Sequence, residues 1–154
     1  MLNTIAQAHN LLTEDALRQA LLDYENDLVR ELAPLEDQLV RNIITGAPGD
    51  IMQHMGYVET WRDRVSRFLM VTSACVEHAK SDHFELPPCT VDGKFIKATE
   101  VRREAYQRRL AGGWVALKGR LENLLDSIDS RVNLCKKVLG IDAEAMAFNR
   151  RAAA

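Results

Sequence analysis

The sequence is poor in aromatic residues, cysteine and proline, and each shortage excludes a class of protein. Aromatic residues make up 6% of the 154 residues, with 3 Cys, 4 Pro and 8 Gly. Collagen-like and low-complexity chains are thereby excluded, and three widely spaced cysteines do not suggest a disulfide framework. No apolar run approaches the roughly 20 residues that a membrane-spanning helix needs, and the N-terminus lacks the features of a signal peptide. We therefore expect a cytoplasmic protein with reduced thiols and no membrane association.

The residues that are abundant favour helices. Leu, Ala, Glu and Arg dominate, and 47% of the chain is hydrophobic against 27% charged. This is enough apolar material for the core of one globular domain, and the net charge of −2 is too small for a disordered chain. The composition predicts a single all-α domain over residues 1–154.

The small net charge hides an uneven distribution. Residues 1–93 carry 7 basic and 15 acidic residues, whereas residues 94–154 carry 13 basic and 7 acidic residues. Such asymmetry indicates either a basic face for an anionic partner or oppositely charged surfaces that meet between subunits.

Apolar residues that recur at steps of three and four predict three long helices. The expected elements are a helix at 13–45, a helix at 50–80, an irregular loop at 81–98, a long helix at 99–139 and a short C-terminal helix at 142–150. Pro34 interrupts the first stripe, so the first helix should kink or restart near Ala33. About 40 helical residues would extend roughly 60 Å, longer than a compact domain of this mass needs. We therefore expect an elongated helical bundle, or a coiled-coil-like hairpin of three long helices, that assembles into a homo-oligomer.

Three glycines lie within the last long helix, at Gly112, Gly113 and Gly119. Each costs roughly 1 kcal/mol relative to alanine inside a helix. Their cluster predicts a bend or a close approach of another helix.

The loop at 81–98 is the one long irregular stretch of the sequence. Leu86-Pro87-Pro88 cannot continue a helix, and the run from Val91 to Phe95 is typical of a turn between two short extended arms. An ordered domain rarely carries about 18 loop residues without a use for them. The loop is therefore a candidate for contact with a partner or with nucleic acid.

Basic and aromatic residues gather where this loop enters the last long helix. Arg102, Tyr106 and Arg109 share a helix face because they are spaced by four and three residues. Guanidinium and ammonium groups bind phosphates, and unstacked bases lie on aromatic rings, so the pattern suits single-stranded nucleic acid. The candidate phosphate-binding residues are Lys94, Lys97, Arg102, Arg103, Arg108 and Arg109, and the candidate stacking residues are Phe95 and Tyr106. The alternative is a solvated face in which Glu100 and Glu104 pair with Arg103 and Arg108.

Four side chains that can bind a metal lie within 15 residues, in the order C-x2-H-x4-H-x5-C. They are Cys75, His78, His83 and Cys89. Zinc accepts two sulfurs and two imidazoles, but the cluster begins inside a helix and matches no standard finger spacing. The alternative is a packed Cys75 with two surface histidines.

Catalytic motifs are missing, and we expect neither catalysis nor a cofactor. The sequence has no Gly-rich phosphate loop, no nucleophile elbow and no H-E-x-x-H pair. Asp126 and Asp129 are the nearest carboxylates at the spacing that a helical magnesium site needs, and they favour a polar helix face instead. Arg131, beside the apolar seam, is expected to pair with Asp129 or with an acidic residue of another helix.

Several short motifs in the C-terminal part form a pattern of their own. They are Lys80-Ser81-Asp82, the Pro-bearing loop, Thr99-Glu100-Val101-Arg102-Arg103, and the run from Leu121 to Arg131 with Ile128, Arg131 and Leu134 in an Ile-x-x-Arg signature. Over about residues 58–140 this pattern resembles the phage recombination-mediator proteins of the UvsY-like type. Residues 1–50 have no counterpart, and the acidic character through residue 93 departs from the basic or mixed chains of that family.

The resemblance implies a small helical oligomer that binds single-stranded DNA and helps a recombinase to displace single-strand-binding protein. It implies binding roles for Lys80, Arg102, Arg103 and Arg131. Our first hypothesis is therefore a DNA-binding accessory protein of a phage or prophage, and the alternative is a structural or adaptor protein whose helical bundle binds other proteins. A zinc-stabilised module is the third hypothesis.

Overall fold

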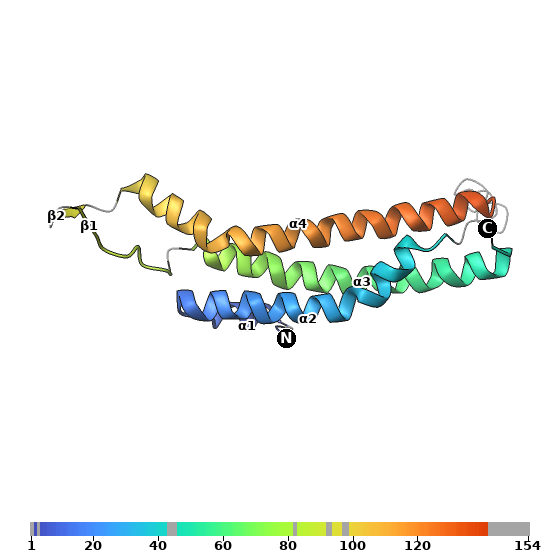
Figure 1. The fold of residues 1–154 in the computed structure, drawn as a ribbon, viewed down its shortest axis with the longest axis horizontal. Helices are drawn as coiled ribbons and strands as arrows, with labels where there is room; N and C mark the ends of the chain where they lie inside the picture. Colours follow the sequence, from blue (N-terminus) through green and yellow to red (C-terminus); the bar gives the residue numbers. More distant parts are fainter. Residues whose placement is uncertain are drawn as a thin grey trace, which may run out of the picture. The chain divides into compact units, whose positions relative to one another are not determined.

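The computed structural model describes residue 2 and residues 4–42, 46–81, 83–91, 94–96 and 99–141. Its elements are α1 (Ile5–His9), α2 (Glu14–Val40), α3 (Pro48–Ala79), β1 (Cys89–Val91), β2 (Lys94–Ile96) and α4 (Glu100–Val138), as labelled in Figure 1. The all-α fold class is confirmed, with three long helices and one small two-stranded sheet in the described residues. Across these residues, no helix combines the length and the apolar character needed to span a membrane.

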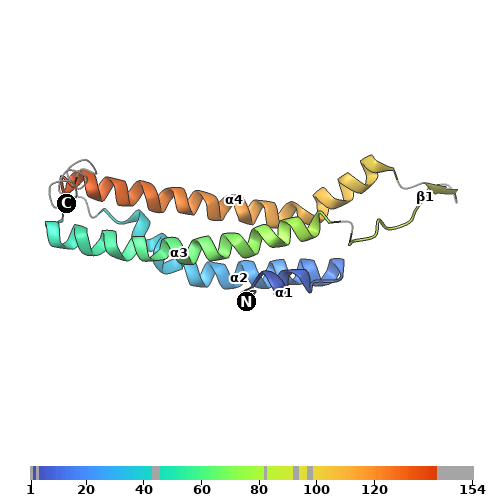
Figure 2. The same cartoon turned by 180° about the vertical axis from the view of Figure 1, so that it is seen from behind.

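The chain divides into two compact units, each described by itself. Unit 1 comprises residues 1–30 and 67–122, and unit 2 comprises residues 31–66 and 123–154. Each of the three long helices contributes one segment to each unit. In unit 1 the first half of α2 lies beside the second half of α3 (Figures 1 and 2).

Capping residues define where the helices begin and end. The Thr13 and Thr99 hydroxyls accept hydrogen bonds from the backbone N–H groups of Ala16 and Arg102, as expected for N-caps of α2 and α4. Gly140, with φ of 66°, ends α4 in the left-handed conformation that glycine adopts easily. The expected C-terminal helix at 142–150 lies outside the described residues.

The structure differs from the expected helix boundaries in three ways. The short helix α1 was not expected, although Thr4 and Gln7 form a capping box that marks its start. Helix α2 continues through Pro34 and ends at Val40, before the expected residue 45. Of the kink or restart expected near Ala33, the restart does not occur. Helix α3 begins at Pro48, because proline suits the first helical position, where no N–H is needed.

The core of unit 1 is built on large side chains from all three long helices. Trp114 of α4 is fully buried, and its ring centroid lies 5.9 Å from that of Tyr24 of α2. The Tyr24 hydroxyl donates a hydrogen bond to the Phe68 carbonyl of α3. Burial raises the Tyr24 pKa to about 12, which keeps the phenol protonated and able to donate.

The core of unit 2 is largely aliphatic, with the buried rings of Trp61 and His54. Its fully buried side chains include Leu32, Leu35, Val58, Val65, Ile128 and Val132. His54 is also buried, and burial followed by the nearby Arg131 and Arg41 lowers its pKa. The stripes of the three long helices therefore face the core in this unit as well.

The irregular loop contains the two extended arms that the sequence predicts. Strands β1 and β2 pair antiparallel, with Cys89 opposite Ile96, Thr90 opposite Phe95 and Val91 opposite Lys94. Because only two strands pair, side chains on both faces of this hairpin lie open to solvent.

The predicted close helix approach occurs at one of the three glycines of α4. A Cβ atom at Gly113 would collide with the Leu21 side chain of α2, whereas nothing lies within 4 Å of the Cβ position at Gly112 or Gly119. A side chain at position 113 would therefore displace Leu21, whereas positions 112 and 119 have room for one.

We expect opposite effects from two adjacent glycine-to-alanine substitutions. Gly112→Ala should raise the free energy of unfolding by about 1 kcal/mol, because alanine is the better helix former and has room. The free energy of unfolding of Gly113→Ala should be equal to or lower than that of the wild type, because Leu21 must leave its rotamer. Urea unfolding of the two variants measures the difference, and equal stability would contradict the close approach.

Candidate nucleic-acid interface

The candidate interface lies in unit 1, where the hairpin joins the first turns of α4. The Arg102 guanidinium donates a hydrogen bond to the Ile96 carbonyl, with an N–O distance of 3.0 Å. This bond holds the first turn of α4 beside β2. The residues of the loop and of the helix therefore belong to one surface, as the sequence predicts.

Three residues that the sequence places on one helix face line one cavity. Arg102, Tyr106 and Arg109 border a surface cavity of about 440 Å³, together with the loop from Leu86 to Thr90. The spacing of four and three residues thus identifies a real face of α4. It does not identify what lies opposite that face.

Tyr106 is turned into the protein and does not offer an open ring. Only 8% of the residue is exposed, and its hydroxyl donates to Glu14 Oε2 over 2.9 Å. Burial, followed by the hydrogen bond and the charge of Glu14, raises the Tyr106 pKa. The expectation that bases stack on Tyr106 is therefore wrong.

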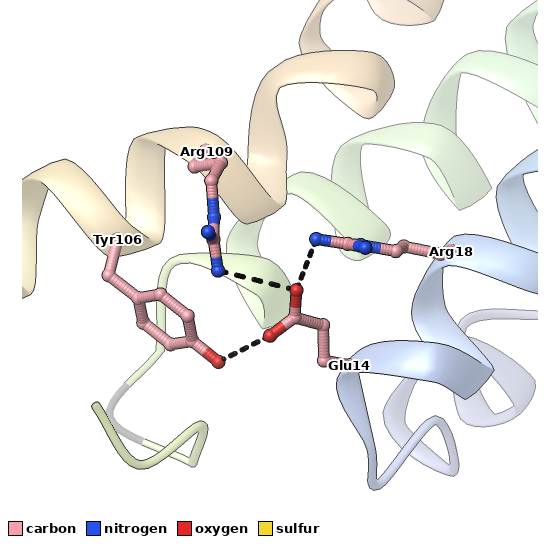
Figure 3. Close-up of polar contacts among 4 residues, drawn as sticks. All are labelled: Glu14, Arg18, Tyr106 and Arg109. Atoms are coloured by element: carbon pink, nitrogen blue, oxygen red, sulfur yellow. Dashed lines mark hydrogen bonds and ion pairs between the residues drawn. The ribbon is translucent and has the colours of Figure 1, made fainter. Parts of the chain in front are cut away.

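Arg109 is also paired within the protein. Its Nη2 lies 3.4 Å from Glu14 Oε1, and its guanidinium lies 5.2 Å from the centre of the Tyr106 ring (Figure 3). Arg18 forms a second ion pair with the same carboxylate. Arg109 therefore does not offer the open phosphate contact that the sequence predicts.

Glu14 is the residue of this region that sequence reasoning missed. Its position in the first turn of α2 suggested only a favourable interaction with the helix dipole. No local pattern connects it with Tyr106 or Arg109, because more than 90 residues separate them. Their contact depends on how α2 and α4 pack.

The other predicted residues of unit 1 remain accessible. Phe95 is 80% exposed, and Lys80, Lys94 and Arg103 are exposed. Within the described part of the chain, no carboxylate forms an ion pair with any of these three cations. Lys97 lies outside the described residues.

Arg108 is paired with a glutamate, as the solvated-face interpretation predicts. It pairs with Glu104 over 3.3 Å, at the spacing of four residues that the solvated-face interpretation requires. Both side chains are more than half exposed, and ion pairs of this kind contribute between 0 and about 1 kcal/mol. Glu104 therefore offsets the charge of Arg108, although the pair adds little free energy.

Arg131 lies in unit 2 and has a structural role. Its guanidinium donates to the backbone carbonyls of Leu39 and Arg41, at the C-terminal end of α2. The last carbonyls of a helix lack partners within the helix, and a cation there is favourable. The expected pairing of Arg131 with Asp129 is wrong, since Asp129 pairs with Arg62.

The four possible zinc ligands do not come together. No group of three or more metal-binding side chains occurs in the described residues. Cys75 is fully buried, and burial raises its pKa to about 12. His78 is buried rather than on the surface, with Nε2 placed 2.9 Å from the Leu11 carbonyl oxygen and its ring 5.5 Å from that of His83.

No family model, curated protein or solved structure matches this chain. The function is therefore inferred from the residues of the candidate interface and their geometry.

We expect the three thiols to differ in reactivity. Cys89 is partly exposed, whereas Cys75 and Cys135 are buried, and burial raises the pKa of both buried thiols. A thiol reagent at pH 8 should modify Cys89 quickly and the other two slowly. Cys89→Ser should remove the fast phase. Joint protection of Cys75 and Cys89, relieved by a chelator, would instead indicate bound metal.

Proposed function

We propose that this protein binds single-stranded DNA through the β1–β2 hairpin and the first turns of α4, as a recombination accessory protein of a phage or prophage. It works without catalysis and as a homo-oligomer. The observation that carries the proposal is the exposure of Phe95 on β2, next to Lys94.

An aromatic ring that is 80% exposed has most of its apolar surface in water. A base that stacks on such a ring covers it, and stacking of this kind is worth roughly 1–3 kcal/mol per base. Lys94 precedes Phe95 in the same strand and supplies an exposed cation for a neighbouring phosphate. The pair combines the two contacts that single-strand binding uses.

Three accessible cations of unit 1 are candidates for phosphate contacts. Lys94 lies on β2, and Arg103 lies in the first turns of α4, which Arg102 joins to β2 through the Ile96 carbonyl. Lys80 follows the end of α3 in the same unit. This interface is smaller than the sequence predicts, because Tyr106, Arg109 and Arg131 have partners inside the protein.

The resemblance to the UvsY-like recombination mediators agrees with this smaller interface. Three of the four residues that it implicates belong to unit 1: Lys80, Arg102 and Arg103. By that resemblance the protein partners are a recombinase and single-strand-binding protein.

Binding should appear in a fluorescence-anisotropy titration with a labelled oligonucleotide at low salt. Affinity should fall as salt rises, because each neutralised phosphate releases counterions. Phe95→Ala should weaken binding by about 5- to 100-fold, which corresponds to the loss of one stacked base. Lys94→Glu should weaken binding and also make the dependence on salt shallower.

Two variants in unit 2 serve as matched controls for this titration. Val40→Ala removes another side chain that is 82% exposed, and Lys137→Glu makes the same charge change at an exposed site in the last turn of α4. Both should bind as the wild type does. Absence of binding by the wild type at low salt would refute the proposal, as would equal losses in the controls.

A second candidate function is protein–protein assembly through the same hairpin. Its apolar side chains are exposed together with that of Val101 in α4, at Val91 (52%), Phe95 (80%), Ile96 (42%) and Val101 (75%). Exposed apolar side chains on both faces of a hairpin suit an interaction site for protein.

The two functions predict different effects of charge. Lys94→Glu should weaken oligonucleotide binding but leave apolar assembly in place, whereas Val101→Ser should weaken assembly first. Light scattering at two protein concentrations, beside the titration, measures both. A mass that rises with concentration and falls in Val101→Ser, without any oligonucleotide binding, would favour the second function.

A further inference from the structure

The Glu14 carboxylate is held between Arg18, Tyr106 and Arg109 (Figure 3). We propose that Arg18, Tyr106 and Arg109 form a phosphate-binding site that Glu14 fills in the free protein and that a phosphate of the bound strand takes over. This inference rests on the proposed function.

The donors around Glu14 match a phosphodiester. Oε2 accepts the Tyr106 hydroxyl over 2.9 Å, and Oε1 receives Arg109 over 3.4 Å together with Arg18. A phosphodiester likewise presents two free oxygens that share one negative charge. The same three donors can therefore serve either group without rearrangement of their hydrogen-bonding pattern.

The charge balance of the site leaves room for an anion. Two guanidinium groups face one carboxylate, so the free protein retains one unbalanced positive charge in this cluster. The Tyr106 phenol stays protonated because burial and Glu14 raise its pKa, so it remains a donor. A phosphate that approaches the site is therefore attracted by this net positive charge and competes with Glu14 for the two arginines.

The charged residues of the site are accessible, and the exchange of Glu14 for a phosphate costs little free energy. Both arginine side chains are 59% exposed, and that of Glu14 is 24% exposed. Ion pairs as exposed as these contribute little free energy, so Glu14 is a weak competitor. Arg109 and Tyr106 also line the cavity that Arg102 and Thr90 border, which connects the site with the hairpin.

Glu14→Gln tests the inference directly. Glutamine keeps the size of the side chain and an acceptor oxygen for Tyr106, but it loses the charge that holds the two arginines. Affinity for a single-stranded oligonucleotide should rise about two- to fivefold, because the competing ion pairs are gone. The log–log salt slope should change by less than about 0.7, because the wild type and the variant contact the same number of phosphates.

Glu122→Gln is the matched control. It makes the same change in net charge within unit 1 and also breaks an ion pair at helical spacing, with Lys118. It lies about 20 Å farther along α4 than Arg109. Its effect on affinity should be smaller than that of Glu14→Gln, and its salt slope should equal that of the wild type.

Arg109→Gln provides the second arm of the experiment. As a single substitution, Arg109→Gln should lower affinity and flatten the salt slope. The double variant Glu14→Gln/Arg109→Gln should bind no more tightly than Arg109→Gln alone. Far-ultraviolet circular dichroism checks that each variant folds. If Glu14→Gln does not fold, the single variant Arg109→Gln decides, and unchanged affinity overturns the inference.

The outcomes separate the inference from the function on which it rests. If the wild type binds and Phe95→Ala weakens binding, but Glu14→Gln gains no more than Glu122→Gln, the phosphate site is refuted and the proposed function stands. If neither the wild type nor any variant binds at low salt, the proposed function fails, and the phosphate site fails with it.

Discussion

The packing of Trp114 against Tyr24 fixes where the polar residues of unit 1 can lie. Because α4 is held against α2 at this contact, residues one to two turns before Trp114 face the first turn of α2. Tyr106 and Arg109 occupy those turns, and Glu14 lies opposite them. Leu21 fits against Gly113 next to Trp114, so the two helices approach closely there. The contacts of Glu14 with Tyr106 and Arg109 are thus a consequence of apolar packing.

Periodicity was sufficient to predict the helices, because their stripes are long and regular. The spacing within the same stripe also indicates that Tyr106 is buried. Tyr106 stands four residues before Leu110 and eight before Trp114, and both of those residues are buried. Spacing assigned Tyr106 to a face correctly, but only tertiary structure shows that this face meets α2. Glu14 and the carbonyls bound by Arg131 lie far away in sequence, so no local pattern could identify them as partners.

The uneven charge of the sequence acquires a partial explanation inside the chain. Glu14 of the acidic part pairs with Arg109 of the basic part, and Asp129 of the basic part pairs with Arg62 of the acidic part. Opposite charges that a subunit contact was expected to bring together therefore meet within one chain. Lys94 of the hairpin and Arg103 of the first turns of α4 are among the exposed cations of unit 1, and Phe95 of the hairpin is also exposed.

Arg131, the arginine of the Ile-x-x-Arg motif, has a structural role in this chain. One guanidinium serves two backbone carbonyls at the end of α2, a geometry that a lysine ammonium reproduces poorly. An arginine at this position therefore serves to satisfy the end of a helix. A residue that a sequence motif offers for ligand binding can thus have a structural role instead.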